Sequence, residues 1–131
     1  MQILPADQLV SRKCSACEGG VDPCSLEHSN GQLQILSNWK LSSDGKVISR
    51  SLILKNFVQA VLCLTKIGDL AEEEAHHPDF HLTGYRNLVI ALTTHAIGGL
   101  SENDFILAAK IDALIREHFP KAKDSDTGNS H

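Results

Sequence analysis

Two pairs of short apolar segments, each followed by a longer segment of helical periodicity, constrain the fold of this 131-residue chain more than any other feature. The first pair comprises residues 39–41 and 46–54, and the second comprises residues 82–83 and 88–94. Polar turns that contain Gly45 and Gly84 join the members of each pair. Strands joined by such short turns must pair in an antiparallel manner. The sequence therefore predicts two β-hairpins.

Three segments around the hairpins carry the signals of α-helices. Residues 25–36 form the first, residues 57–75 the second, before Pro78, and the third runs from residue 102 to about Phe119. Each follows a residue that makes a good N-cap, namely Ser25, Asn56 and Ser101. Within the second and third segments apolar residues recur at helical spacing: Phe57, Ala60, Val61, Leu64, Ile67 and Ala71, then Phe105, Ala108, Ile111 and Ile115.

The order α-β-β-α-β-β-α predicts an α+β fold, a four-stranded antiparallel sheet with three helices packed on one face. The length fits a single domain, which we place at residues 25–119. Residues 1–24 contain two prolines and two adjacent glycines with little periodicity, and are predicted to form an irregular arm. Residues 120–131 are predicted to be a polar, disordered tail. The sheet would leave an edge strand open to pairing with another subunit.

Charge and composition exclude several classes of partner. The formal net charge of −4 does not favour nucleic acid or an anionic membrane. No apolar run reaches the 18 or so residues that a membrane span requires, and we expect a cytoplasmic protein, with an organelle location after presequence removal left open. Cys14, Cys17, Cys24 and His28 could together hold zinc, or the thiols could simply be reduced side chains of a flexible arm. Cys63 lies within a helical pattern and is predicted to be a core residue.

The stretch EEEAHHPDF, residues 72–80, gathers titratable groups where the second helix ends. Glu72 and His76 are four residues apart, as are Glu73 and His77, so each pair would share a helix face. A carboxylate beside an imidazole orients it and favours its charged form. Strand alternation places a third histidine, His95, on the face opposite Leu88, Ile90, Leu92 and Thr94.

Three interpretations of these histidines are open from the pattern alone. They could do nothing beyond favourable charge contact at a helix end. Three histidines and a carboxylate could hold zinc, although consecutive histidines point in different directions. They could also transfer protons without a metal, since the pKa of histidine lies near working pH.

Two longer motifs, EEEAHHPDF and TTHAIGGLSENDFILAAKID, closely resemble the pterin-4a-carbinolamine dehydratase family, also known as dimerisation cofactors, in its plant or protist branch. The resemblance covers residues 25–119. The matching positions, in order, are Glu72, His76, His77, Pro78, Phe80, Thr94, His95, Gly99, Leu100 and Asp104.

The resemblance implies a hydro-lyase that removes water from a 4a-hydroxytetrahydropterin and yields a quinonoid dihydropterin, with no cofactor and no metal. It implies that His76, His77 and His95 are catalytic, with His95 or His77 protonating the leaving hydroxyl. For substrate binding it implies that Glu72 orients His76, Asp104 orders the pocket, Thr94 contacts the pterin edge and Pro78 is architectural.

The resemblance also implies a homodimer or homotetramer. The main alternative is an interaction protein without catalytic function, since animal members of the family bind the dimerisation helix of a transcription factor. The relevant surface here is the apolar face of the second helix, with Val58, Leu62 and Cys63. A non-dehydratase paralogue would be expected to lack one of the three histidines, and all three are present.

The chain departs from the animal proteins at several positions. Gly84 lengthens the second hairpin turn by one residue. Phe80 stands where tryptophan is common, which predicts weaker stacking. Asn103 stands where an arginine can occur, so one substrate or surface contact of the animal proteins is expected to be absent.

Overall fold

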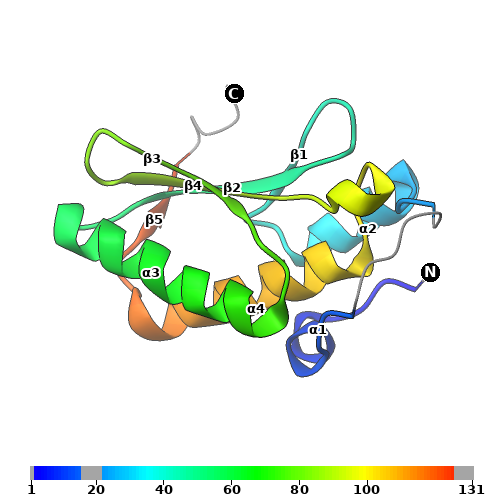
Figure 1. The fold of residues 1–131 in the computed structure, drawn as a ribbon, viewed down its shortest axis with the longest axis horizontal. Coiled ribbons are helices and arrows are strands. Elements are labelled where there is room, and N and C mark those ends of the chain that lie inside the picture. The colour runs from blue at the N-terminus through cyan, green and yellow to red at the C-terminus, as the bar shows by residue number, and fades with distance from the viewer. Residues whose placement is uncertain (1, 16–21, 126–131) are drawn as a thin grey trace.

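A computed structural model of the chain describes residues 2–15 and 22–125. The helices are α1 (Ala6–Ser11), α2 (Leu26–Ile35), α3 (Phe57–Glu74), the 3₁₀ helix η1 (His95–Ile97) and α4 (Glu102–His118); the strands are β1 (Lys40–Leu41), β2 (Ile48–Ile53), β3 (Asp79–Thr83), β4 (Asn87–Leu92) and β5 (Lys123–Asp124). The long helices α3 and α4 lie together on one face of the sheet (Figure 1). The predicted α+β fold is confirmed.

The sheet is antiparallel throughout, with the order β1-β2-β4-β3. Strand β2 pairs with β4 along its whole length, from Ile48 opposite Leu92 to Ile53 opposite Asn87. Strand β1 pairs with the first residues of β2, and β5 pairs with its last residues, Leu52 and Ile53. Strands β3 and β4 form the second hairpin, whose turn residues Gly84 and Tyr85 both have positive φ. Three residues, 84–86, connect the paired Thr83 and Asn87, and glycine adopts the positive φ at the first of them without steric cost.

The helix starts follow the predicted caps. The Ser25 hydroxyl accepts a hydrogen bond from the His28 backbone N–H, and the Asn56 side chain accepts one from Gln59. Helix α4 begins with a complete capping box between Ser101 and Asp104. These caps satisfy backbone donors that the first helical turn leaves unpaired, so they set where each helix begins.

The core lies between the sheet and the two long helices. Leu88, Ile90 and Leu92, which strand alternation predicted to share one face, are fully buried. The α4 stripe of Phe105, Ala108, Ile111 and Ile115 is buried as well. Cys63 is buried, as predicted for a core residue, and therefore does not belong to the surface of α3 with Val58 and Leu62. None of the helices in the described ranges combines the length and the hydropathy needed to cross a bilayer.

Both terminal segments contain structure that was not predicted. Within residues 1–24, predicted to be irregular, α1 packs on α4 through the buried side chain of Leu9. Within the predicted disordered tail, Lys123 and Asp124 form β5, and the sheet therefore has five strands instead of four. The reason is tertiary, because the Asp124 carboxylate accepts hydrogen bonds from the buried Arg50 of β2 at 2.8 and 3.3 Å. Residues 126–131 of the tail lie outside the described residues.

Candidate active site

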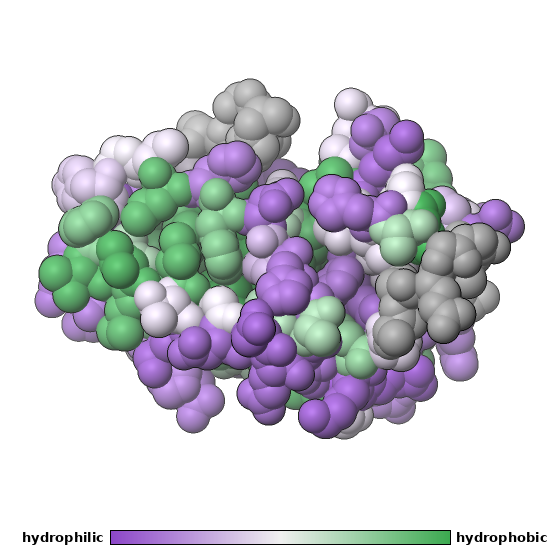
Figure 2. All heavy atoms as spheres, viewed as in Figure 1, coloured by the Kyte–Doolittle hydropathy of each residue, from purple (hydrophilic) through white to green (hydrophobic). Residues whose placement is uncertain are grey.

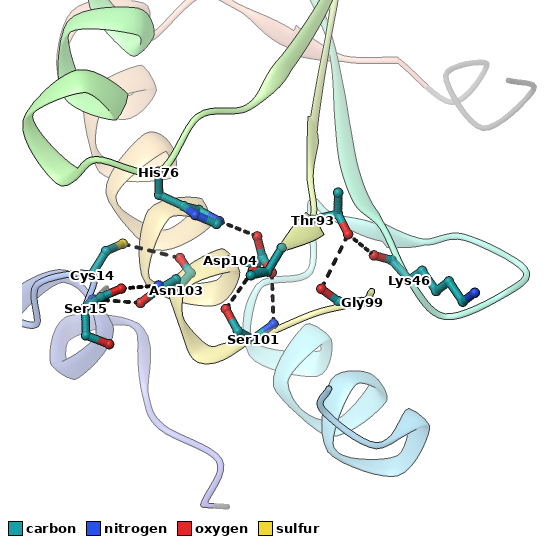
Figure 3. A network of polar contacts seen from close by, with 10 residues as sticks. Cys14, Ser15, Lys46, His76, Thr93, Gly99, Ser101, Asn103 and Asp104 are labelled. Atoms are coloured by element: carbon teal, nitrogen blue, oxygen red, sulfur yellow. Dashed lines mark hydrogen bonds and ion pairs between the residues drawn. The ribbon is translucent and has the colours of Figure 1, made fainter. Parts of the chain in front are cut away.

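The Asp104 carboxylate is the centre of a network of polar contacts (Figure 3). Its side chain is fully buried, at the start of α4. One oxygen, Oδ1, lies 2.6 Å from Nε2 of His76, which follows α3. The other, Oδ2, accepts hydrogen bonds from the Thr94 hydroxyl at 2.8 Å and from the Ser101 backbone N–H at 2.9 Å. Asp104 thus links the residues that follow α3 and β4 to the start of α4.

Local backbone structure holds the partners of Asp104 in place. The capping box fixes the carboxylate over the first turn of α4. Thr94 forms an isolated antiparallel bridge with Gly99, which closes the short loop containing η1. The Thr94 and Ser101 hydroxyls are also 2.7 Å apart. The carboxylate therefore has a defined orientation before any ligand binds.

The predicted pairing of glutamates and histidines is wrong. Ala75 adopts a left-handed conformation, with φ 54°, and ends α3 before the histidines. His76 therefore contacts Asp104 and not Glu72, and the His77 ring lies 2.8 Å from the Glu72 carboxylate. The predicted i, i+4 partners would require helical geometry to continue through His77.

The two adjacent histidines have very different environments. The His76 side chain is 11% exposed, whereas that of His77 is 65% exposed and its partner Glu72 is 79% exposed. A buried hydrogen bond to a carboxylate holds an imidazole in one orientation, whereas an exposed ion pair contributes little. The pair His76–Asp104 can thus orient a ring nitrogen, while His77 can exchange protons with bound substrate or water.

His95 does not continue strand β4 as predicted. The strand ends at Leu92, and His95 is the first residue of η1, exposed to solvent. It directly follows Thr94, whose hydroxyl donates to Asp104. The chain connectivity therefore brings His95 to the segment that contacts Asp104. Pro78, the remaining predicted site residue, separates His77 from the start of β3.

Sequence reasoning missed a second group of contacts beside Asp104. The Asn103 side chain exchanges hydrogen bonds with the Ser15 backbone, and the Glu74 carboxylate accepts from the Cys14 backbone N–H and from Lys110. The only local signal was the capping box, which marks where α4 begins but not which residues of the arm lie against it. These contacts join residues that are 36 to 88 positions apart in the sequence.

The arm cysteines have the properties of protonated thiols. Burial, followed by the charge of Glu74, raises the pKa of the Cys14 thiol to about 12, and burial raises that of Cys24 to about 11. Within residues 2–15 and 22–125, no cluster of three or more histidine, cysteine or acidic side chains is arranged to hold a metal ion. Cys17 lies outside the described residues, so the zinc alternative that includes it stays a prediction.

Comparison with known proteins matches this architecture to a family. Residues 22–114 match the family described as pterin 4 alpha carbinolamine dehydratase. A protein from Nitrosomonas eutropha, provisionally named a pterin-4-alpha-carbinolamine dehydratase, is 44% identical over 108 residues, covering 82% of this chain and 93% of that protein. The Arabidopsis thaliana protein named pterin-4-alpha-carbinolamine dehydratase 2, mitochondrial, is 40% identical over 119 residues, which cover 88% of this chain and 63% of that protein.

A solved structure agrees with the fold. The crystal structure of a transcriptional coactivator/pterin dehydratase from Brucella melitensis superposes with a TM-score of 0.66 at 27% identity, covering 71% of this chain and 98% of that one. The family match, the named relatives and the shared fold indicate a protein of the dehydratase class. The chain belongs to the pterin-4a-carbinolamine dehydratase family.

Proposed function

We propose that this protein is a hydro-lyase that dehydrates 4a-hydroxytetrahydropterins by histidine acid–base catalysis. The family and the names of its relatives support the reaction. The main observation behind the mechanism is the pairing of the partly buried His76 with the fully buried carboxylate of Asp104, next to the exposed His77. The product would return to the tetrahydropterin pool used by aromatic amino acid hydroxylases.

The reaction requires two proton transfers. A proton must reach the leaving 4a-hydroxyl, which departs as water, and a ring nitrogen must lose a proton as the quinonoid dihydropterin forms. His95 or His77 delivers the first proton in this proposal, because both are exposed and can meet the substrate. His76 accepts the second through the ring nitrogen that Asp104 leaves available. Histidine suits both steps, because the pKa of an imidazole ordinarily lies near working pH.

Neither metal nor cofactor takes part in the proposed reaction. Glu72 would orient His77, in place of the His76 assigned to it from sequence. Thr94 would contact the pterin edge while its hydroxyl stays hydrogen-bonded to Asp104.

The test is a stopped-flow assay in which a hydroxylase generates the 4a-hydroxytetrahydropterin and formation of the quinonoid product is followed. His77→Ala and His95→Ala should each lower turnover by about 10² to 10⁴, the usual contribution of a general acid or base. His118→Ala is the matched control, because His118 is exposed at the opposite end of α4. Activity should survive a chelator. Near-wild-type turnover of both His77→Ala and His95→Ala would contradict the assignment.

We also propose that the protein forms a homodimer or homotetramer through α3. The exposed apolar residues of this helix are Phe57, Val58, Val61 and Leu62. Apolar atoms gather over this side of the molecule, on the left of Figure 2. A contiguous exposed apolar patch commonly marks an interaction site. Light scattering after size-exclusion chromatography should give a multimer for the wild type and a smaller species for Val58→Asp; a monomeric wild type would contradict this proposal.

A further inference from the structure

The N-terminal arm crosses the two helix ends that carry the candidate site. Cys14 lies against the last residue of α3 and the second residue of α4. We name the contacts of Cys14 and Ser15 with Glu74 and Asn103, together with the Glu74–Lys110 ion pair, the arm–helix network. These arm residues lie outside residues 22–114, which match the family.

Two buried polar side chains, those of Asn103 and Glu74, form the hydrogen bonds of this network. The Asn103 amide donates to the Ser15 carbonyl at 2.7 Å, and its oxygen accepts from the Ser15 N–H at 3.0 Å. The Glu74 carboxylate accepts from the Cys14 N–H at 2.9 Å and from Lys110 Nζ at 2.8 Å. Asn103 is 5% exposed and Glu74 is 7% exposed. Hydrogen bonds are stronger when one partner is charged, and also when they lie in the low-dielectric interior of a protein.

The network adjoins the catalytic pair on both sides. Asn103 precedes Asp104 in α4, and Glu74 stands two residues before His76 at the end of α3. Figure 3 shows Cys14, Ser15 and Asn103 beside the hydrogen bond that joins His76 to Asp104. The Cys14 thiol adds a contact of 3.6 Å to the Asn103 carbonyl. These bonds therefore attach the arm to both helix ends, next to the residues that carry the His76–Asp104 contact.

We infer that Asn103 and Glu74 are positioning residues, which act through the arm to hold His76 in hydrogen-bond contact with Asp104. Neither touches the substrate in this scheme. A displacement of about 1 Å in a catalytic group can cost about 10²-fold in rate. Because the network acts on orientation, its loss should lower kcat and leave KM within about twofold. The expected fall in kcat rests on the proposed function. The expected change in the His76–Asp104 contact does not.

The first test uses Asn103→Ala, which removes both bonds to Ser15 and leaves Asp104 intact. In the stopped-flow assay kcat should fall by roughly 10- to 100-fold. The Nε2 resonance of His76, observed in ¹⁵N-labelled protein, should move as its bond to Asp104 lengthens. Arg12→Ala is the control, because it removes an arm contact of 2.7 Å to Glu102 that is largely exposed to solvent. It should leave both readouts unchanged.

A second variant, Glu74→Gln, carries the test if Asn103→Ala does not fold. It keeps an oxygen for the Cys14 N–H but removes the charge that pairs with Lys110. A folded variant of either kind with unchanged kcat and an unchanged His76 resonance would overturn the inference. If the wild type shows no dehydration, the proposed function fails, and the His76 resonance still decides whether the network positions this residue.

Discussion

Replacing Asp104 with asparagine should separate the chemical function of this carboxylate from its structural function. The substitution keeps the shape of the side chain and one oxygen. That oxygen can still accept from Thr94 and from the Ser101 backbone, which are 2.8 and 2.9 Å from Oδ2. The position that faces His76 becomes an NH₂ group, so the 2.6 Å contact loses its charged acceptor.

The size of the effect follows from the one bond that is lost. A hydrogen bond to a charged group contributes about 1.5–3 kcal/mol. If the proposed mechanism uses that bond in the transition state, kcat should fall by about 10-fold to about 150-fold. Stability should fall less than for Asp104→Ala, because the capping box keeps its acceptor.

The assay is dehydration by stopped flow, with urea unfolding of the same preparations. Asp69→Asn is the control, an exposed acid of α3 whose replacement should leave both measurements unchanged. A folded Asp104→Asn protein with kcat within about twofold of wild type would refute the reasoning. The His76–Asp104 contact would then be structural only.

Three further predictions concern stability. Arg50→Met should reduce the free energy of unfolding by about 3–5 kcal/mol in urea titrations, because it leaves Asp112 mostly buried beside a single remaining donor, the Trp39 indole; a loss below about 1 kcal/mol would contradict it. Ser29→Ala should leave the melting temperature unchanged or higher, because the buried Ser29 hydroxyl has no hydrogen-bond partner within the described part of the chain; a clear decrease would argue against this. Burial raises the pKa of Glu74, but hydrogen bonds from Lys110 and the Cys14 backbone outweigh it and hold the pKa below its ordinary range. The stabilisation from ionised Glu74 is therefore present at neutral pH and lost as pH falls through the folded-state pKa, so unfolding of wild type and Glu74→Gln should differ less in acid than at neutral pH.

Helical periodicity predicted the apolar residues of α3, but not which of them are buried. The spacing of apolar residues on α3 identified both Ala60 and Val61 as apolar positions of one helix. The structure buries Ala60 completely and leaves Val61 40% exposed. Helical periodicity locates an apolar face but cannot say where the edge of the core lies, because that depends on which neighbouring elements cover the helix.

Local features of the chain determined the elements and most of their ends. Ser25, Asn56 and Ser101 cap their helices as predicted, because a cap is made by residues only two or three positions away. Strand alternation predicted that Leu88, Ile90 and Leu92 share one face of β4, and the structure buries that face.

The partners within the site were decided only by the tertiary structure. The left-handed conformation at Ala75 ends α3 and sends His76 to Asp104, which is 28 positions away, so the helical pairs expected from spacing do not form. Strand β5 and the arm–helix network likewise depend on buried partners at long range, Arg50 for β5 and Glu74 and Asn103 for the arm. Residue spacing describes neighbours along one element, whereas these bonds depend on where different elements end in space.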